Sequence, residues 1–149
     1  KLKFYYGDLT ERQFRNIFKK ASNIKGDTSQ ILIELLERRL DATVYRMKFV
    51  PTIFSARQLV NHGHVKVNGK RVNIPSYSVS DGDEISIRDK SKEINLIVES
   101  VSSQEREIPE YLEVDVKELK GRFLRAPLIH DVPYPVTMEP NLVIEYYSR

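Results

Sequence analysis

The chain has 149 residues, enough for one domain or for two small ones that share a core. Hydrophobic residues make up 40% of it, and its 30% of charged residues is mixed in sign, which argues against wholesale disorder. The absence of cysteine excludes disulfides, thiol catalysis and cysteine-ligated zinc within this sequence, and it fits a reducing compartment. No long apolar run predicts a membrane span, and the first residues show no signal-peptide pattern. They also lack an initiator Met, which indicates a processed or truncated chain.

Charge is distributed unevenly along the chain. Residues 1–71 hold 15 Lys and Arg against 6 Asp and Glu, a net charge of +9, whereas residues 72–149 hold 9 against 15, a net charge of −6. Chance clustering of solvated charge is one explanation. A basic half beside an acidic half is more typical of a surface that binds a polyanion, backed by a surface that faces protein.

Two amphipathic helices are predicted in the first 40 residues. Residues 9–22 form the first, because Thr10 and Gln13 fit a capping box at its start. Its apolar residues recur at helical spacing: Phe14, Ile17, Phe18 and Ala21. The segment 24–29 breaks this helix, and residues 29–40 predict a second. The residues expected to be buried there are Ile31, Leu32, Leu35 and Leu36.

Two short helices are predicted next. Asp41 can cap a helix over residues 42–47, since a carboxylate accepts the exposed N–H groups at the positive end of a helix. Thr52 can cap the following helix, which Gly63 ends because glycine adopts a positive φ at no steric cost. Its core-facing residues are Ala56, Leu59 and Val60, and those facing elsewhere are Arg57, Gln58 and Asn61.

Short antiparallel strands are predicted from residue 64 on. Residues 64–72 form a hairpin that turns at Asn68-Gly69, the strongest turn signal in the chain. Residues 77–88 predict a second hairpin that turns near Asp81-Gly82, with Ile85 and Ile87 on one face.

The remaining segments give weaker signals. Residues 91–101 favour a helix, although their β-branched residues leave a strand open, and residues 111–127 favour two strands around Gly121. The tail contains Pro133, Pro135 and Pro140, so much of it is expected to be extended or turned. Its apolar segment, residues 141–147, is expected to dock on the core as either a helix or a strand.

No catalytic or metal-binding pattern stands out. The sequence has no G-x-S-x-G elbow, Walker loop or G-x-G-x-x-G motif. His62 and His64 flank a helix end without a third ligand, and His130 is distant in sequence, so contact with RNA or local packing is favoured over metal binding. Glu34 and Glu37 lie beside arginines and are expected to form solvated salt bridges.

One short stretch resembles an enzyme motif. Residues 38–46, RRLDATVYR, are similar to the Arg-Leu-Asp of pseudouridine synthases, in which the Asp is the catalytic nucleophile. Those enzymes continue with a Thr-Ser-Gly-like stretch inside a larger catalytic domain. Here Ala42-Thr43-Val44-Tyr45 follows instead, so a helix cap is the favoured role of Asp41, and no enzymatic activity, cofactor or metal is predicted.

A basic corner stands out, consisting of Arg57, Gln58, His62, His64, Lys66, Lys70 and Arg71. Arg donates two parallel hydrogen bonds to phosphate oxygens, Lys supplies a point charge, and side-chain amides bond to ribose. The expected ligand of this corner is therefore a nucleic-acid backbone. The corner lacks the stacked aromatics of a single-strand reader and has no helix typical of major-groove reading. Recognition of folded RNA by its shape is therefore predicted. The candidate RNA-binding residues are Lys1, Lys3, Arg12, Arg15, Lys19, Arg38, Arg39, Arg46, Thr52, Ser55, Arg57, Gln58, His62, His64, Lys66, Asn68, Lys70 and Arg71.

Residues 35–91, from LLERRLDATVYR through VNHGHVKVNGKRV to ISIRDKS, resemble the RNA-binding module of the bacterial-type small-subunit ribosomal protein four family. That module also recurs in tyrosyl-tRNA synthetases, pseudouridine synthases and ribosome-rescue factors. The start, KLKFYYGDLTERQFRNIFKKA, and the closing YLEVD, KGRF and NLVIEYYSR are similar to the ribosomal protein on both sides of the module. The resemblance covers nearly all of the chain and begins after the family's N-terminal arm.

The resemblance implies an α+β fold. Residues 1–40 would form a helical first domain completed by the tail, about 135–149, and residues 41–134 an RNA-binding module of helices packed on a small antiparallel sheet. It implies a structural protein that binds small-subunit ribosomal RNA early, nucleates the body of the subunit and, with small-subunit protein five, influences accuracy.

The implied partners are that RNA, protein five and messenger RNA where it enters the subunit, with no membrane. The expected location is the small ribosomal subunit in the cytoplasm, with an organellar ribosome left open. The alternative is a free-standing RNA-binding factor of the rescue or heat-shock type that uses the same module.

Overall fold

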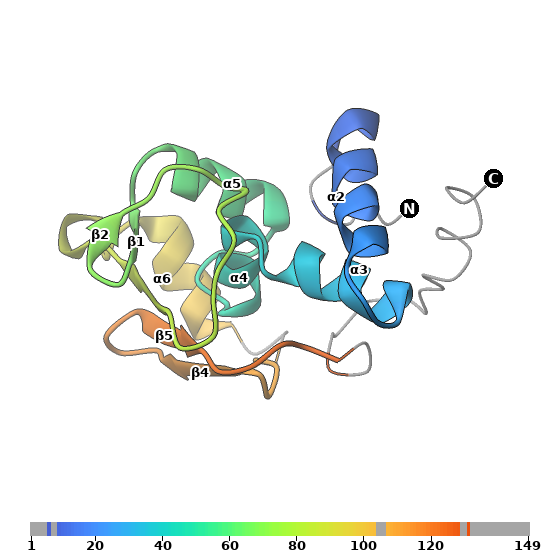
Figure 1. Cartoon of the computed structure of the whole chain (residues 1–149). Coiled ribbons are helices and arrows are strands. Elements are labelled where there is room, and N and C mark those ends of the chain that lie inside the picture. Colours follow the sequence, from blue (N-terminus) through green and yellow to red (C-terminus); the bar gives the residue numbers. More distant parts are fainter. Residues whose placement is uncertain (1–5, 7–8, 104–106, 129–130, 132–149) are drawn as a thin grey trace. The chain divides into compact units, whose positions relative to one another are not determined.

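The computed structural model describes Tyr6, residues 9–103, residues 107–128 and Asp131. Helices and a five-stranded antiparallel sheet confirm the expected α+β class (Figure 1). The chain divides into two compact units. One comprises the described residues of 1–37 and 127–149, and the other is residues 38–126. The predicted docking of the tail lies outside the described residues.

The first unit contains α2 (Glu11–Asn23) and α3 (Thr28–Glu37). The predicted capping box is confirmed: Thr10 Oγ1 accepts from the Gln13 N–H at 3.1 Å, and Gln13 Oε1 accepts from the Thr10 N–H at 3.0 Å. In α3, Ile33 is buried and Leu35 is only half-buried, so the expected burial of Leu35 was wrong. The helix also ends at Glu37 and not at residue 40.

The second unit contains α4 (Leu40–Arg46), α5 (Ile53–Asn61) and α6 (Asn95–Ser102), with a short 3-10 turn, η1 (Asp89–Ser91). Thr52 caps α5 as predicted, and Ser55 completes a capping box with it. The helical interpretation of residues 91–101 is confirmed by α6. The predicted cap of α4 is wrong, because the N-cap position is Arg39 and Asp41 lies within the first turn.

The sheet consists of β1 (Val65–Val67), β2 (Lys70–Arg71), β3 (Glu84–Ile87), β4 (Leu112–Asp115) and β5 (Lys120–Phe123), in the order β2-β1-β3-β5-β4. All neighbours are antiparallel. The first hairpin is confirmed, with φ of 51° at Asn68 and 83° at Gly69, the positive values that a type I′ turn requires.

The predicted second hairpin is wrong. Both edges of β3 are taken by β1 and β5, so residues 77–80 have no place beside it. They run instead along the start of α4, where Ser78 forms an isolated bridge with Arg39 and the Val79 N–H donates to Arg38 O at 2.7 Å. Gly82 does turn with a positive φ of 86°, but that turn leads into β3 from a loop and not from a strand.

The two strands predicted in residues 111–127 are present, but Gly121 lies inside β5 and the turn is formed by residues 116–119. Close packing explains the glycine. A Cβ at position 121 would lie 2.9 Å from Glu113 O and 2.9 Å from Met47 Sδ.

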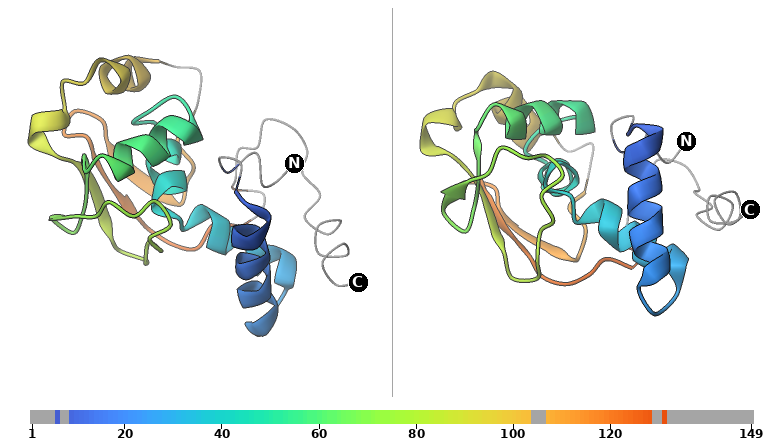
Figure 2. Two further views of the ribbon diagram at one scale, coloured as in Figure 1. Left: turned by 90° about the horizontal axis from the view of Figure 1, so that it is seen from above. Right: turned by 45° about the horizontal axis from the view of Figure 1, so that its top comes forward.

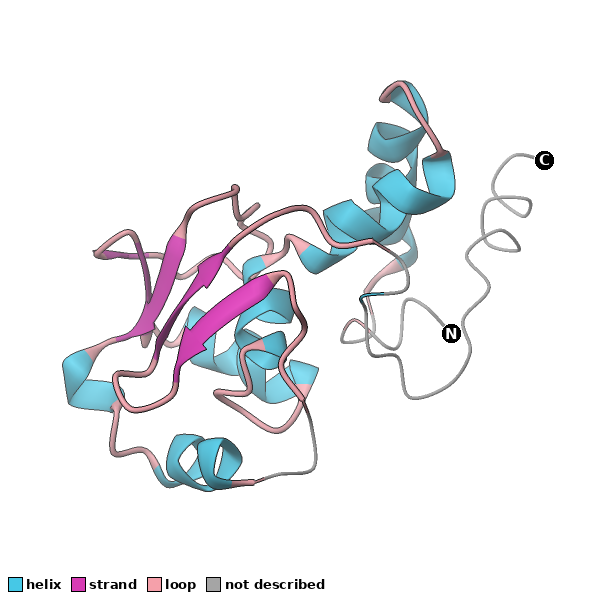
Figure 3. Cartoon of the chain, turned by 90° about the horizontal axis from the view of Figure 1, so that it is seen from below, coloured by secondary structure: helices cyan, strands magenta, loops and turns pink. Residues whose placement is uncertain are grey.

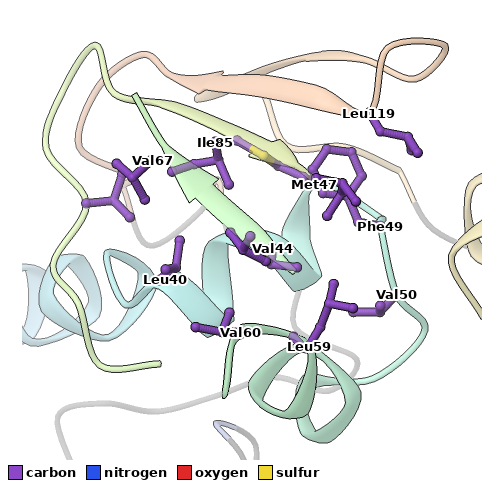
Figure 4. Packing of buried hydrophobic residues seen from close by; sticks show 14 of the residues in the cluster. Leu40, Val44, Met47, Phe49, Val50, Leu59, Val60, Val67, Ile85 and Leu119 are labelled. Atoms are coloured by element: carbon purple, nitrogen blue, oxygen red, sulfur yellow. The ribbon is translucent and has the colours of Figure 1, made fainter. Parts of the chain in front are cut away.

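The core of the second unit lies between one face of the sheet and the three helices. Figure 4 shows Leu40 and Val44 of α4, Val60 of α5, Val67 of β1 and Ile85 of β3 meeting in one buried cluster. In the views of Figure 2, α4, α5 and α6 all cover this same face. The strands therefore alternate buried residues with residues on the opposite, open face, as in β3, where Ile85 and Ile87 share one face as predicted and are buried there.

Candidate RNA-binding surface

The exposed side of α5 forms one edge of the candidate surface. Its opposite side is anchored by the predicted core residues Ala56, Leu59 and Val60, together with Ile53. Helical periodicity therefore turns Gln58, Asn61 and His62 to solvent. The structure thus supports the predicted facing of this helix, with amide groups on a rigid element.

Gly63 joins the end of α5 to the hairpin. Its φ of 80° confirms the predicted helix stop. Its missing side chain also serves Arg71, because a Cβ there would lie 2.4 Å from Arg71 Nη2. Arg71 Nε donates to Gly63 O at 3.0 Å. The guanidinium is thereby fixed against the helix end while the residue stays exposed.

The hairpin presents two further cations. Lys70 is exposed at the start of β2, and Lys66 is half-buried on β1, directly opposite Arg71 in the register. Residues directly opposite on neighbouring strands share one face of a sheet. The hairpin therefore places Lys66 and Arg71 side by side.

The neighbourhood of His64 is strongly basic. Its Nδ1 lies 2.6 Å from Ser91 Oγ, and Ser91 is buried. The pKa of His64 is lowered, first by burial and then by the charges of Arg88, His62 and Arg71. The same cluster that disfavours a protonated imidazole favours an anion such as a phosphate. Among the described residues, no group of three His, Asp or Glu could hold a metal ion.

Arg57 is less outward than expected. Its Nε lies 3.5 Å from Asp41 Oδ2, and its side chain is 29% exposed, whereas that of Asp41 is 1% exposed. Arg39 holds the same carboxylate through two hydrogen bonds of 3.1 and 3.0 Å. Asp41 Oδ1 also accepts from the Ala42 N–H at 2.7 Å. Asp41 is therefore an anchor that links the start of α4 to α5, and it fixes Arg57 at the rim of the surface.

Three predicted arginines serve the fold. Arg38 donates to Val79 O at 2.9 Å and to Asp81 Oδ1 at 2.7 Å, and its guanidinium lies over the Phe123 ring at 4.9 Å. Arg39 and Arg46 are buried, 7% and 4% exposed. Arg46 also lies 5.5 Å from the centre of the Tyr45 ring, so all three arginines have a structural role within the second unit.

Three further candidate RNA-binding residues, Asn68, Thr52 and Ser55, form hydrogen bonds within the protein. The Asn68 amide donates to Asp83 Oδ1 and accepts from the Glu84 N–H, both at 2.9 Å, and so fixes the hairpin turn. The hydroxyls of Thr52 and Ser55 bond to each other at 2.8 Å in the cap of α5. The polar side chains of these three residues therefore stabilise the hairpin turn and the start of α5.

The candidates of the first unit lie on α2. Arg12, Arg15 and Lys19 are all exposed, and Arg15 pairs loosely with Glu11 at 3.9 Å. Lys1 and Lys3 lie outside the described residues.

Sequence reasoning missed two residues near the surface. Arg88 follows β3 and acts on His64; its side-chain direction depends on strand pairing, which the mistaken second hairpin concealed. Phe54 is 48% exposed in the first turn of α5, three and four residues before Arg57 and Gln58. Residues three and four positions apart share one face of a helix, so the spacing in the sequence was enough to predict that Phe54 lies on the same face as Arg57 and Gln58.

The described helices include none that is both long and apolar enough to cross a membrane.

Comparison with known proteins matches residues 38–85 to the family described as S4 domain, and residues 1–37 to the family described as ribosomal protein S4/S9 N-terminal domain. Small ribosomal subunit protein uS4 of Ruegeria sp. (strain TM1040) is 63% identical to the chain over 149 residues. The proteins of the same name from Ruegeria pomeroyi and Paracoccus denitrificans are 62% and 61% identical. Each alignment covers 100% of this chain and 72% of the relative.

Proposed function

Because this chain belongs to the family of small ribosomal subunit protein uS4, and is thus a structural ribosomal protein that binds ribosomal RNA and not an enzyme, we propose that it binds that RNA early and nucleates assembly of the subunit body. A family match over residues 1–37, ahead of the module, and the alignment of uS4 relatives with the whole chain favour this over a free-standing factor, which would share only the module.

The observation that carries the proposal is the fixed geometry of the basic corner. Arg71 is held on Gly63 O, Arg57 is held by Asp41, and Lys70 is exposed on the hairpin. Cations held in place lose little side-chain freedom when they meet phosphates, so they read the shape of a folded RNA efficiently. Such a surface suits a junction of several RNA helices.

We further propose that small-subunit protein five is a direct partner, that messenger RNA passes near the chain where it enters the subunit, and that the chain works in the cytoplasm. Exposed acidic residues on β4 and in the turn after it, Glu113, Asp115 and Glu118, support a protein-facing edge. In the same proposal the tail, about 135–149, completes the first unit.

Crosslinking the purified chain to whole small-subunit RNA, with the adducts mapped on both molecules, tests the main proposal. Adducts from α5 and the hairpin at a single multi-helix junction are expected. Adducts scattered over the RNA, or absent from residues 54–71, would contradict it. Reversal of Glu113, Asp115 and Glu118 to Lys should reduce co-sedimentation with protein five and leave RNA binding intact or slightly stronger.

A further inference from the structure

The open face of the sheet carries basic residues outside the corner. Since Val65, Val67, Ile85 and Ile87 point into the core, their neighbours along β1 and β3 point to the opposite face. Lys66 and Ser86 are half-buried there, and Lys120 of β5 is exposed. None of the described helices of the second unit covers this face, which Figure 3 shows turned away from α4 and α6.

The strand register aligns these residues in one row. Arg71 lies opposite Lys66, Lys66 opposite Ser86, and Ser86 opposite Lys120. Neighbouring strands are about 4.8 Å apart, so the row spans about 14 Å across four strands. Three cations and one hydroxyl thus form a line on a rigid sheet.

The adjacent row differs in charge. There Glu84 lies opposite Arg122, and Arg122 lies opposite Glu113. Arg122 pairs with Glu84 at 3.7 Å and donates to Gly82 O at 2.7 Å, so its charge is compensated within the sheet.

In the first row, by contrast, neither Lys66 nor Lys120 forms an ion pair with any residue that the structure describes. Asp115 lies opposite Lys120 at the end of this row, and the two side chains form no ion pair in the described structure. The first row therefore has excess positive charge, and the second does not.

We propose that the row Arg71, Lys66, Ser86 and Lys120 binds a stretch of RNA phosphate backbone that continues from the basic corner. The inference rests on the proposed function. Arg71 belongs to both the corner and the row, which makes the two surfaces continuous. The lysines attract phosphates, and the Ser86 hydroxyl donates to a phosphate oxygen or meets a ribose 2′-OH.

This row combines residues from the basic half and from the acidic half of the sequence. Lys120 lies in the half with a net charge of −6, for which a protein-facing role was predicted. Folding places it opposite Ser86, in the same row as Lys66 and Arg71 of the basic half.

The test measures binding of the full chain to whole small-subunit RNA on filters over a salt series. Lys120→Gln should weaken binding about three- to tenfold at low salt and reduce the steepness of the log affinity against log salt plot by about 0.7 to 0.9. Lys117→Gln is the matched control, because Lys117 is an exposed cation in the turn outside the row. It should change affinity less than twofold. Asp115→Asn should strengthen binding.

The possible outcomes distinguish a failure of the proposed function from a failure of the proposed row. If the unaltered chain fails to bind the RNA, the proposed function fails. If it binds and Lys120→Gln matches it, only the row is wrong. Equal losses for Lys117→Gln and Lys120→Gln would show a general effect of net charge and overturn the row, as would weaker binding by Asp115→Asn. Thermal melting followed by circular dichroism confirms that each variant is folded.

Discussion

Arg39 and Arg71 are both arginines of the second unit, but they differ in burial and in their hydrogen-bond partners. Arg39 is 7% exposed and gives two hydrogen bonds to a carboxylate that is itself buried. Arg71 gives one bond to the Gly63 carbonyl, packs its guanidinium against Gly63, and stays exposed as a residue. Basic residues that look equivalent in the sequence thus separate into a set that is buried and holds the fold and a set that stays exposed. Burial and partners decide between the sets, and net charge does not.

The largest expected effect is on stability. Arg39→Ala leaves Asp41, with its side chain 1% exposed, without its two-pronged partner, which should lower the free energy of unfolding by about 3 kcal/mol. Urea denaturation followed by circular dichroism measures this. Arg12→Ala, which removes an exposed arginine on α2, should leave the midpoint nearly unchanged. Equal effects of the two variants would erase the distinction between the sets.

A pair of glycine variants isolates the support of Arg71. Gly63→Ala forces a side chain into a φ of 80° and onto the guanidinium, whereas Gly69→Ala has a similar φ of 83° with nothing within 4 Å. Both should lose about 1 to 2 kcal/mol of stability. Filter binding should show that Gly63→Ala also loses RNA affinity, as Arg71→Ala does, while Gly69→Ala retains it. If affinity falls equally in both glycine variants, the packing of Gly63 on Arg71 is irrelevant to binding.

The outward set should affect binding without affecting folding. Lys70→Ala should weaken ribosomal RNA binding by about 1 to 3 kcal/mol with an unchanged melting temperature, since Lys70 is exposed. Arg57→Ala should weaken binding by a similar amount and cost some stability, because Asp41 loses one of its two arginine partners. Affinity that holds while the fold weakens would move Arg57 into the structural set.

A smaller effect concerns pH. Because the pKa of His64 is lowered in the folded chain, the unfolded state takes up a proton first as pH falls below about 6.5. The free energy of unfolding should therefore decrease from pH 7 towards 5.5, and His64→Gln should remove that decrease. His62→Gln, which removes one neighbouring group, should retain most of it. A decrease that survives His64→Gln would contradict the assignment.

Local signals allowed much of the fold to be predicted. The capping boxes, the Asn68-Gly69 turn and the stop at Gly63 each depend on a few adjacent residues. The burial of Leu35 and the end of α3 were local errors, whereas the larger errors are long-range. Residues 77–80 follow Arg39 and not β3, and Asp41 is shared by arginines on either side of it.

Part of the basic corner was similarly predictable as a cluster, since His62, His64, Lys66 and Arg71 lie close together, while the roles of its members were not. The hydrogen bonds that use Asn68 connect the hairpin turn to residues about 15 positions away. The position of Lys120 on the basic row depends on strand order. Composition and periodicity contain neither kind of information.

The salt dependence of ribosomal RNA affinity tests the central claim most directly, when the unaltered chain is compared with a variant carrying Lys66→Ala, Lys70→Ala and Arg71→Ala. With about five to eight phosphate contacts, the unaltered chain should show a slope of log affinity against log salt between about −3.5 and −7. The variant should lose about 2 to 3 units of that slope and melt at the same temperature. An unchanged slope, or a variant that no longer folds, would contradict the claim that these cations face RNA and do not hold the fold.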